Sequence, residues 1–142
     1  MPIYAPVPEA QRLTLVKVLE HATHLNQLIF ALLIGSALVS AAIWAVQATR
    51  PAPSRAGAGL AFLSGVLVVS PLLALAAAAY QLTHMSLGVA NLRPTPDVAT
   101  LAPGFAEMSL LVFLGLAAAG VAAAGRVHLS LRSGGASGPA AA

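Results

Sequence analysis

The sequence predicts an all-α integral membrane protein with three transmembrane helices and an N-terminal amphipathic helical segment. Of the 142 residues, 58% are hydrophobic and only 8% are charged, a balance far from that of a soluble domain. The seven basic and four acidic residues leave three uncharged intervals, 21–49, 56–92 and 108–125. Because a bilayer core of ~30 Å needs about 20 helical residues, each interval has room for one spanning helix.

The N-terminal segment, residues 1–24, is predicted to contain an interfacial helix. Leu13, Val16 and Leu19 fall on one helical face, and the charged residues fall elsewhere. This is the pattern of a helix that lies along the membrane surface. We expect this helix to run directly into the first span.

The membrane domain is predicted to cover residues 25–132, followed by a disordered tail at 133–142. Its three spans are expected at about 25–48, 60–82 and 106–125. Trp44 prefers the headgroup level, and the prolines and glycines that follow it end the first span near Ala48. Inside the second span, Ser70-Pro71 predicts a kink, because proline frees a backbone carbonyl.

The distribution of charge predicts the orientation in the membrane. The 47–58 connection and the C-terminal segment carry four arginines and no acid, whereas the other side has three basic residues and all four acids. Positive residues stay on the cytoplasmic side. We therefore expect an outside N-terminus and a cytoplasmic C-terminus.

Composition also argues against several functions. The net charge of +3 is spread over the connections without any run of Lys or Arg, so nucleic acid is not an expected partner. The chain has no cysteine, which excludes thiol catalysis. It has no Gly-rich phosphate loop and no nucleophile elbow with plausible partners. The chain is therefore predicted to be no enzyme and to carry no cofactor.

Small residues at four-residue spacing predict close helix packing. In the third span these residues form two pairs, Gly115 with Ala119 and Gly120 with Ala124, and the first span holds Ser36 and Ser40. A three-helix bundle has little interior in which to bury such faces. Homo-oligomerisation or a partner subunit is the expected consequence, with burial inside one chain as the alternative.

The start of the third span resembles the third-helix signature of the MotA/TolQ/ExbB proton-channel family. In that signature, an Ala-Pro-Gly-apolar-Ala-Glu turn opens a helix that continues through Gly-Leu-x-Ala-Ala. The matching positions here are Ala102, Pro103, Gly104, Ala106, Glu107, Gly115, Leu116, Ala118 and Ala119. The match covers about 28 residues, 101–128, and the predicted three-span topology is also similar to that of the family.

The resemblance implies a subunit of the bacterial inner membrane that forms an oligomeric ring with a single-span partner of the ExbD/TolR/MotB type and couples proton flow to that partner. This chain departs from the family pattern in two places. Val112 stands where conducting members usually have threonine, and no threonine lies near Ser64-Gly65 or Ser70-Pro71 in the second span. The alternative is a non-conducting membrane scaffold or accessory subunit of a larger complex.

Glu107 has two interpretations. A carboxylate in the first turn of a helix, after Pro103 near its first position, is stabilised by free N–H groups and the helix dipole. Alternatively, an ionisable group at the membrane edge of a span exchanges protons with water. On this second hypothesis, Ser70 and Ser109 join Glu107 as proton-pathway candidates, although serines in spans more often bond their own backbone.

Three histidines fall on the predicted outer side. His21, His24 and His84 carry imidazoles of the kind that ligate metal or haem. His128, the fourth, lies on the other side, so no transmembrane haem pair is apparent. No metal site is therefore predicted.

Overall fold

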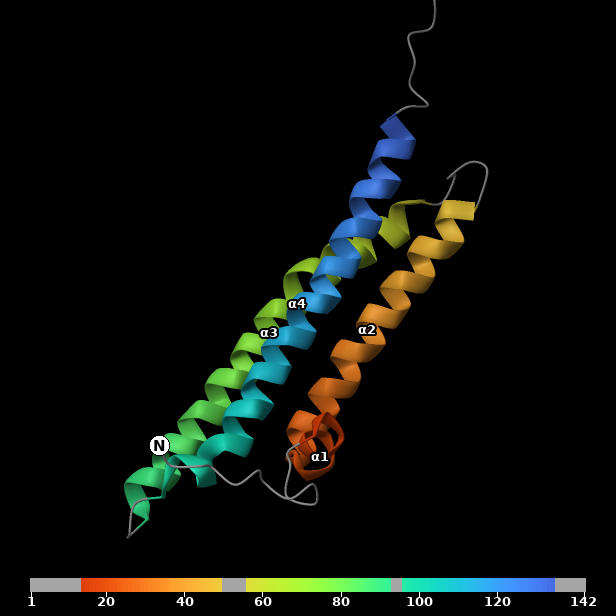
Figure 1. The fold of residues 1–142 in the computed structure, drawn as a ribbon. Coiled ribbons are helices and arrows are strands. Elements are labelled where there is room, and N and C mark those ends of the chain that lie inside the picture. The colour runs from red at the N-terminus through yellow and green to blue at the C-terminus, as the bar shows by residue number, and fades with distance from the viewer. Residues whose placement is uncertain (1–13, 50–55, 93–95, 135–142) are drawn as a thin grey trace, which may run out of the picture.

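The computed structural model describes residues 14–49, 56–92 and 96–134. Within these ranges the chain forms four α-helices and no strand. Their bounds are α1 Leu15–His21, α2 His24–Thr49, α3 Ala56–Asn91 and α4 Val98–Gly134. The long helices run up, down and up along one elongated bundle, and α1 lies at the end where α2 begins (Figure 1). That same end holds the last turns of α3 and the first turns of α4, so three distant parts of the sequence meet there.

The three long helices are each long and apolar enough to cross a membrane, as the sequence predicts. At 1.5 Å per residue, the 36 residues of α3 and the 37 residues of α4 extend about 54 and 56 Å. Both helices therefore continue beyond the predicted spans and beyond a bilayer core of about 30 Å. Pro71 lies inside α3, which continues through it as one helix.

The N-terminal helix differs from the prediction. It has only seven residues, and the chain leaves helical geometry at Ala22 before α2 begins at His24. The expectation of one helix running into the first span is therefore wrong. Val18 and Ala22 are buried against the bundle and Leu19 packs beside them, whereas Val16 is 62% exposed. Residues 1–13 of the predicted segment lie outside the described residues.

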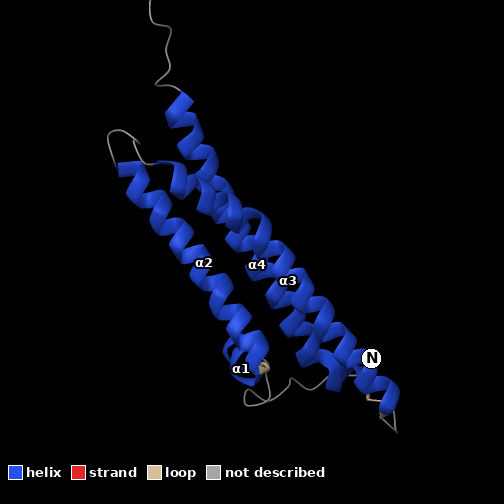
Figure 2. Cartoon of the chain, turned by 180° about the vertical axis from the view of Figure 1, so that it is seen from behind, coloured by secondary structure: helices blue, strands red, loops and turns tan. Residues whose placement is uncertain are grey.

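The helices pack unequally. α3 and α4 share the most extensive contact, α2 contacts α4 more than α3, and Figure 2 shows α2 set to one side of this pair. At the end described above, the core consists of Ile29, Phe30 and Leu33 with Ala74, Ala77 and Leu111. In the other half it consists of Leu63, Val66, Ala118, Ala122 and Leu129.

Between these clusters, Gly115 brings α4 directly against α3. A Cβ at Gly115 would lie 2.4 Å from the Ala74 Cβ and 2.9 Å from the Ser70 carbonyl oxygen. Ala119 is also buried, whereas Gly120 and Ala124 are exposed, with nothing within 4 Å of a Cβ at Gly120. Five residues rotate a helix by about 140° beyond a full turn. The two predicted small-residue pairs therefore lie on different faces, and the first is buried within the chain.

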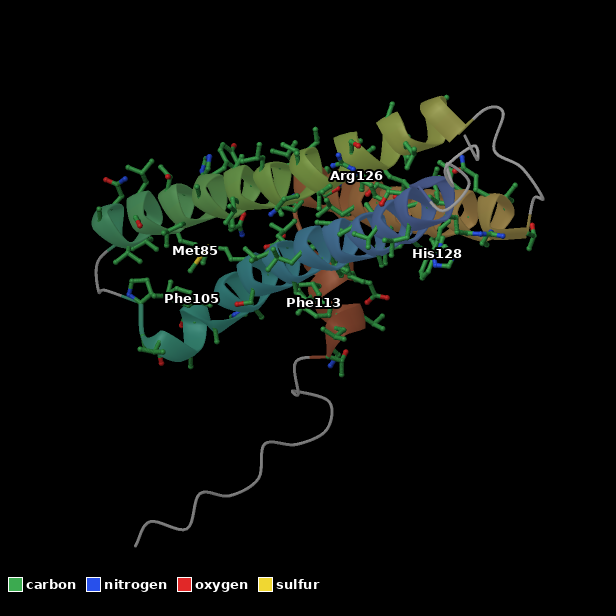
Figure 3. The ribbon with its side chains drawn as sticks, turned by 90° about the horizontal axis from the view of Figure 1, so that it is seen from above. Met85, Phe105, Phe113, Arg126 and His128 are labelled. Atoms are coloured by element: carbon green, nitrogen blue, oxygen red, sulfur yellow. The ribbon has the colours of Figure 1, made fainter. Side chains whose placement is uncertain are left out.

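The far end of the bundle is joined by side chains of α4. The Arg132 guanidinium donates a hydrogen bond to the Ala48 carbonyl oxygen near the last turn of α2. Nearby, the His128 and Trp44 rings lie 6.0 Å apart between centroids. Figure 3, a view from above, shows His128 at the opposite end of the molecule from Met85 and Phe105. Residues 135–142 of the predicted tail lie outside the described residues, while residues 133–134 belong to α4.

Candidate functional site

Glu107 is not in the first turn of its helix. α4 begins at Val98, and Asp97 accepts hydrogen bonds from the Thr100 N–H at 2.9 Å and from the Thr100 hydroxyl. Glu107 lies ten residues after Asp97, about 15 Å along the axis, where the backbone N–H groups are engaged in the helix. The capping interpretation of Glu107 is therefore wrong, because Asp97 occupies that position. Pro103 lies inside α4 and does not start it.

Glu107 instead forms a cluster with one carboxamide from each of the other two spanning helices. Asn26 of α2 donates from Nδ2 to Glu107 Oε1 at 2.8 Å, and Gln81 of α3 donates from Nε2 to Glu107 Oε2 at 2.7 Å. Asn26 Nδ2 also donates to Gln81 Oε1 at 3.0 Å. The three side chains close a ring, and we call them the polar cluster.

The polar cluster is shielded from its surroundings. Asn26 is fully buried, Glu107 is 7% exposed and Gln81 is partly buried. Both carboxylate oxygens accept a hydrogen bond, and the Asn26 amide has two acceptors, one for each N–H. The buried Asn26 Oδ1 accepts no hydrogen bond from the described residues. The arrangement suits a carboxylate, because a carboxylate accepts at both oxygens while each amide nitrogen can only donate.

Local sequence places each member at one end of a span. Asn26 is in the first turn of α2, where its backbone N–H donates to the Thr23 hydroxyl at 3.4 Å. With α2, α3 and α4 each centred in a bilayer core of about 30 Å, Asn26, Gln81 and Glu107 lie about 11 to 16 Å from the midplane. The polar cluster thus lies near the edge of the hydrocarbon core, where a polar group costs less than at the centre.

Gly104 allows α3 and α4 to approach beside the polar cluster. A Cβ at Gly104 would lie 2.5 Å from the Met85 sulfur. Met85 projects from α3 at the end where Phe105 marks the first turns of α4 (Figure 3). The glycine of the family-like signature therefore makes room for a thioether, and this close approach helps bring Gln81 and Glu107 within hydrogen-bond distance.

The two serine candidates do not join Glu107. Ser109 is exposed and donates to the Phe105 carbonyl oxygen at 2.9 Å, because two residues rotate a helix by about 200° and turn it away from the polar cluster. Ser70 is buried at the contact with Gly115, eleven residues or about 16 Å along α3 from Gln81. Ser36 and Ser64 bond carbonyl oxygens of their own helices, and Ser40 is fully buried.

His24 and His84 lie at the same end of the bundle, each beside a residue of its own helix. His24 Nδ1 lies 3.5 Å from Gln27 Oε1, and the His84 ring packs against the Tyr80 ring at a tilt of 59°, with centroids 4.4 Å apart. Among the described residues, no group of three or more His, Cys, Asp or Glu side chains is positioned to hold a metal ion. The His21 side chain lies outside the description.

Toward the bundle centre, the polar cluster faces an apolar layer. Ile29, Phe30 and Leu33 of α2 meet Ala74, Ala77 and Leu111 directly beyond it. Val112, which departs from the family pattern, is partly buried on α4. In the described residues, no second polar side chain continues the polar cluster into this layer.

Sequence reasoning missed Asn26 and Gln81, although a signal existed. Both are polar residues inside the uncharged intervals, and both fall at the span ends predicted to lie on the same side as Glu107. Topology alone therefore placed the three residues at one depth. What it did not supply was the rotation of each helix, which decides whether a side chain at that depth faces its neighbours or lipid.

Comparisons with protein-family models, curated proteins and solved structures find no match for this chain. The resemblance of residues 101–128 to the MotA/TolQ/ExbB signature therefore stays a prediction.

Proposed function

We propose that this protein is a bacterial inner-membrane subunit of the MotA/TolQ/ExbB type, in which Glu107 binds and releases a proton. The observation that carries the proposal is the position of Glu107, buried between three membrane-spanning helices and bonded to Asn26 and Gln81. Ionisable side chains inside spans are costly and are found mainly where they serve ion movement or ligand binding. Because Glu107 does not cap its helix, proton exchange is the better explanation for an acid at this position.

A purely structural tie would not need a carboxylate. A third carboxamide at position 107 would also cross-link the helices and would avoid the desolvation of a charge, which costs several kcal/mol per ion in proteins. Besides a second acceptor oxygen, glutamate adds a proton that can be exchanged, which a carboxamide lacks. This comparison favours a role in proton transfer over a role in packing alone.

The same geometry supports assembly into an oligomeric ring. The apolar layer beyond the polar cluster leaves a single bundle without a polar route to its other end. Gly120 and Ala124 present an open face on α4 that a neighbouring helix could approach closely. We therefore propose that protons pass between subunits or beside a single-span partner, with the polar cluster on the outer side and the C-terminus in the cytoplasm.

A non-conducting scaffold is the second candidate, and one observation favours it. Both oxygens of Glu107 already accept hydrogen bonds. Toward the bundle centre, the next positions are the apolar Val112 of α4 and Ala77 of α3, where a conducting path needs polar groups. In this function the polar cluster sets the relative rotation of the helices, and a larger complex binds their outer faces.

Replacement of the titratable group distinguishes the two functions. In Glu107→Gln, an amide keeps the size of the side chain but cannot exchange a proton, so we expect proton flux through the complex to fall to background. The mass of the complex in mild detergent should be unchanged. Glu107→Asp keeps the acid and should retain part of the flux.

A matched double variant controls for damage to the polar cluster. Gln81→Glu combined with Glu107→Gln restores one carboxylate and two carboxamides, but on a different helix. Restored stability without restored flux would tie proton transfer to position 107. Wild-type flux in the single variant Glu107→Gln would remove the proton role and leave the scaffold.

A further inference from the structure

A groove lies beside the polar cluster, between the start of α2 and the last third of α3. Its volume is about 390 Å³, and its lining consists of Thr23, Leu25, Tyr80, Gln81, His84 and Met85. Four of these six side chains are polar or carry a polar group. The elements that line it lie at the end of the bundle where α1, the end of α3 and the start of α4 meet (Figure 1).

Gln81 belongs to both the groove and the polar cluster. Its side chain lines the groove, while its Nε2 donates to Glu107 Oε2 at 2.7 Å. A single carboxamide therefore separates the groove from the buried carboxylate. Rotation about the side-chain bonds of Gln81 would bring Glu107 Oε2 into contact with whatever fills the groove.

We propose that this groove is a water-filled inlet through which protons reach Glu107, with His84 as the proton-exchanging group at its mouth. The inference rests on the proposed proton-binding role of Glu107. Imidazole takes up and releases protons near neutral pH. A proton taken up by the His84 ring passes through water to Glu107 Oε2, leaving a neutral imidazole and a neutral carboxyl group. Gln81 stands between the two, and its hydrogen bond to Oε2 opens before the proton arrives.

The groups around His84 suit this role. His84 is exposed and contacts the Tyr80 ring of its own helix. From α2, the groove receives Thr23 and Leu25, which are uncharged. From α4, the titratable group nearest to the groove lining is Glu107, behind Gln81. His84 and Glu107 therefore form a donor and acceptor pair with one carboxamide between them.

A second groove of nearly equal size offers a contrast. It has a volume of about 400 Å³ between the middle parts of α2 and α3, and its lining is mainly apolar, with Phe62, Val69 and Leu73 beside Ser36 and Ser70. The Ser36 hydroxyl already donates to the Leu33 carbonyl oxygen, and Ser70 is buried. Water fills cavities that offer it several polar partners and avoids apolar ones. This second groove therefore faces hydrocarbon, while the groove beside Gln81 holds water.

Cysteine accessibility tests the inlet directly, because the natural chain contains no cysteine. We would place single cysteines in the full chain in liposomes and treat them from the outer side with a charged, membrane-impermeant methanethiosulfonate. Gln81→Cys should react at least tenfold faster than Ala79→Cys. In the protein alone Ala79 is exposed and Gln81 is only partly exposed, so exposure by itself predicts faster labelling at position 79. In the membrane, lipid would cover position 79 while water in the groove reaches position 81, and the order of the two labelling rates would be reversed.

Two further variants keep this test decisive. Met85→Cys lines the same groove without bonding the polar cluster and should react as fast as Gln81→Cys, even if the loss of Gln81 disturbs the helices. Val69→Cys, in the apolar groove, should react as slowly as Ala79→Cys. Equal rates for Met85→Cys and Val69→Cys, or reaction only from the cytoplasmic side, would overturn the inlet.

The role of His84 is tested by proton flux. His84→Gln should lower the flux of the complex at least threefold and flatten its dependence on outer pH, whereas His128→Gln, the same change at the opposite end, should alter neither. Unchanged flux and pH dependence in His84→Gln would overturn its role. Slow Met85→Cys labelling with an inactive Glu107→Gln would overturn the inlet alone. Fast labelling with a fully active Glu107→Gln would instead overturn the proposed function.

Discussion

The polar cluster and the contact around Gly115 hold the same two helices together by different means. At Gly115, α4 lies so close to Ala74 and the Ser70 carbonyl that no side chain fits between them. At the polar cluster, two long side chains, Gln81 and Glu107, reach across the space between α3 and α4. The Gly115 contact requires a residue without a side chain, whereas the polar cluster requires hydrogen-bond donors and acceptors at particular positions.

The difference separates a contact that sets distance from a contact that sets rotation. Close packing of small residues gains dispersion energy and tolerates any apolar neighbour of the right shape. Hydrogen bonds at the polar cluster require that Asn26, Gln81 and Glu107 all face one point. Only the polar cluster joins all three spanning helices through side-chain hydrogen bonds between helices in the described residues.

The largest effect is expected at Gly115. In Gly115→Leu, the new side chain would overlap the Ala74 side chain and the α3 backbone, which cannot move without shifting the helix. Overpacking of this kind costs about 1 to 3 kcal/mol, and a backbone neighbour places this variant near the upper value. Unfolding in mixed detergent micelles, followed by circular dichroism, measures the loss.

Gly120→Leu is the matched control for this variant. It introduces the same side chain five residues later, at a site with open space, and its stability should stay within about 0.5 kcal/mol of the wild-type value. If neighbouring subunits approach this face, Gly120→Leu should instead reduce the mass of the complex. A large loss of monomer stability in Gly120→Leu, or none in Gly115→Leu, would contradict the assigned helix faces.

A smaller effect is expected at the polar cluster. Asn26→Leu removes two interhelical hydrogen bonds from a fully buried position and should cost about 2 kcal/mol. Gln81→Leu also removes two bonds but from a partly exposed side chain, and about 1 kcal/mol is expected. The same micelle unfolding assay ranks the two variants.

The double variant of Asn26 and Gln81 sharpens the comparison. Because the three side chains form one ring, the two losses should not add, and the double variant should differ from their sum by at least about 0.5 kcal/mol. Strict additivity would show that Glu107 is held by two independent bonds. For Gly115 and Asn26, which share no partner, additivity is expected.

The sequence predicts the Gly115 contact better than it predicts the polar cluster. Gly115 and Ala119 are recognisable because small residues four apart share a helix face, and Glu107 is recognisable because its charge stands directly before an apolar interval. Asn26 and Gln81 carry no charge and lie 55 residues apart in the chain. Their meeting with Glu107 depends on the rotation of three helices, which apolar periodicity does not specify when lipid and protein are both apolar.

The start of α4 was mispredicted for a related reason. Pro103-Gly104 predicts the beginning of the helix, because proline favours the first helical position. Asp97, three residues before Thr100, was the stronger signal, since an Asp side chain accepts from the backbone N–H groups of the first turn. The charge of Glu107 and the Pro103-Gly104 pair hid this start, because an interval bounded by charged residues begins only at position 108.

The smallest effect is expected at Asp97, and it separates the two acids of α4. A hydrogen bond from the Thr100 hydroxyl, followed by one from the Thr100 backbone N–H, lowers the pKa of Asp97 below its ordinary value of 3.8. Because the folded pKa is the lower one, the stabilisation by this cap is complete above pH 3.8 and is lost as the pH falls through the folded pKa. Hydrogen exchange of the first turn of α4 should therefore speed up only in strongly acidic buffer.

In Asp97→Asn, which still caps but does not titrate, the exchange rate should lack this acid-induced increase, and the polar cluster around Glu107 should keep its stability in both proteins. If acid increased hydrogen exchange around Asp97 and around Gln81 in parallel, the first turn of α4 and the polar cluster would unfold as one unit. That result would contradict the separation of a capping acid, Asp97, from a buried one, Glu107.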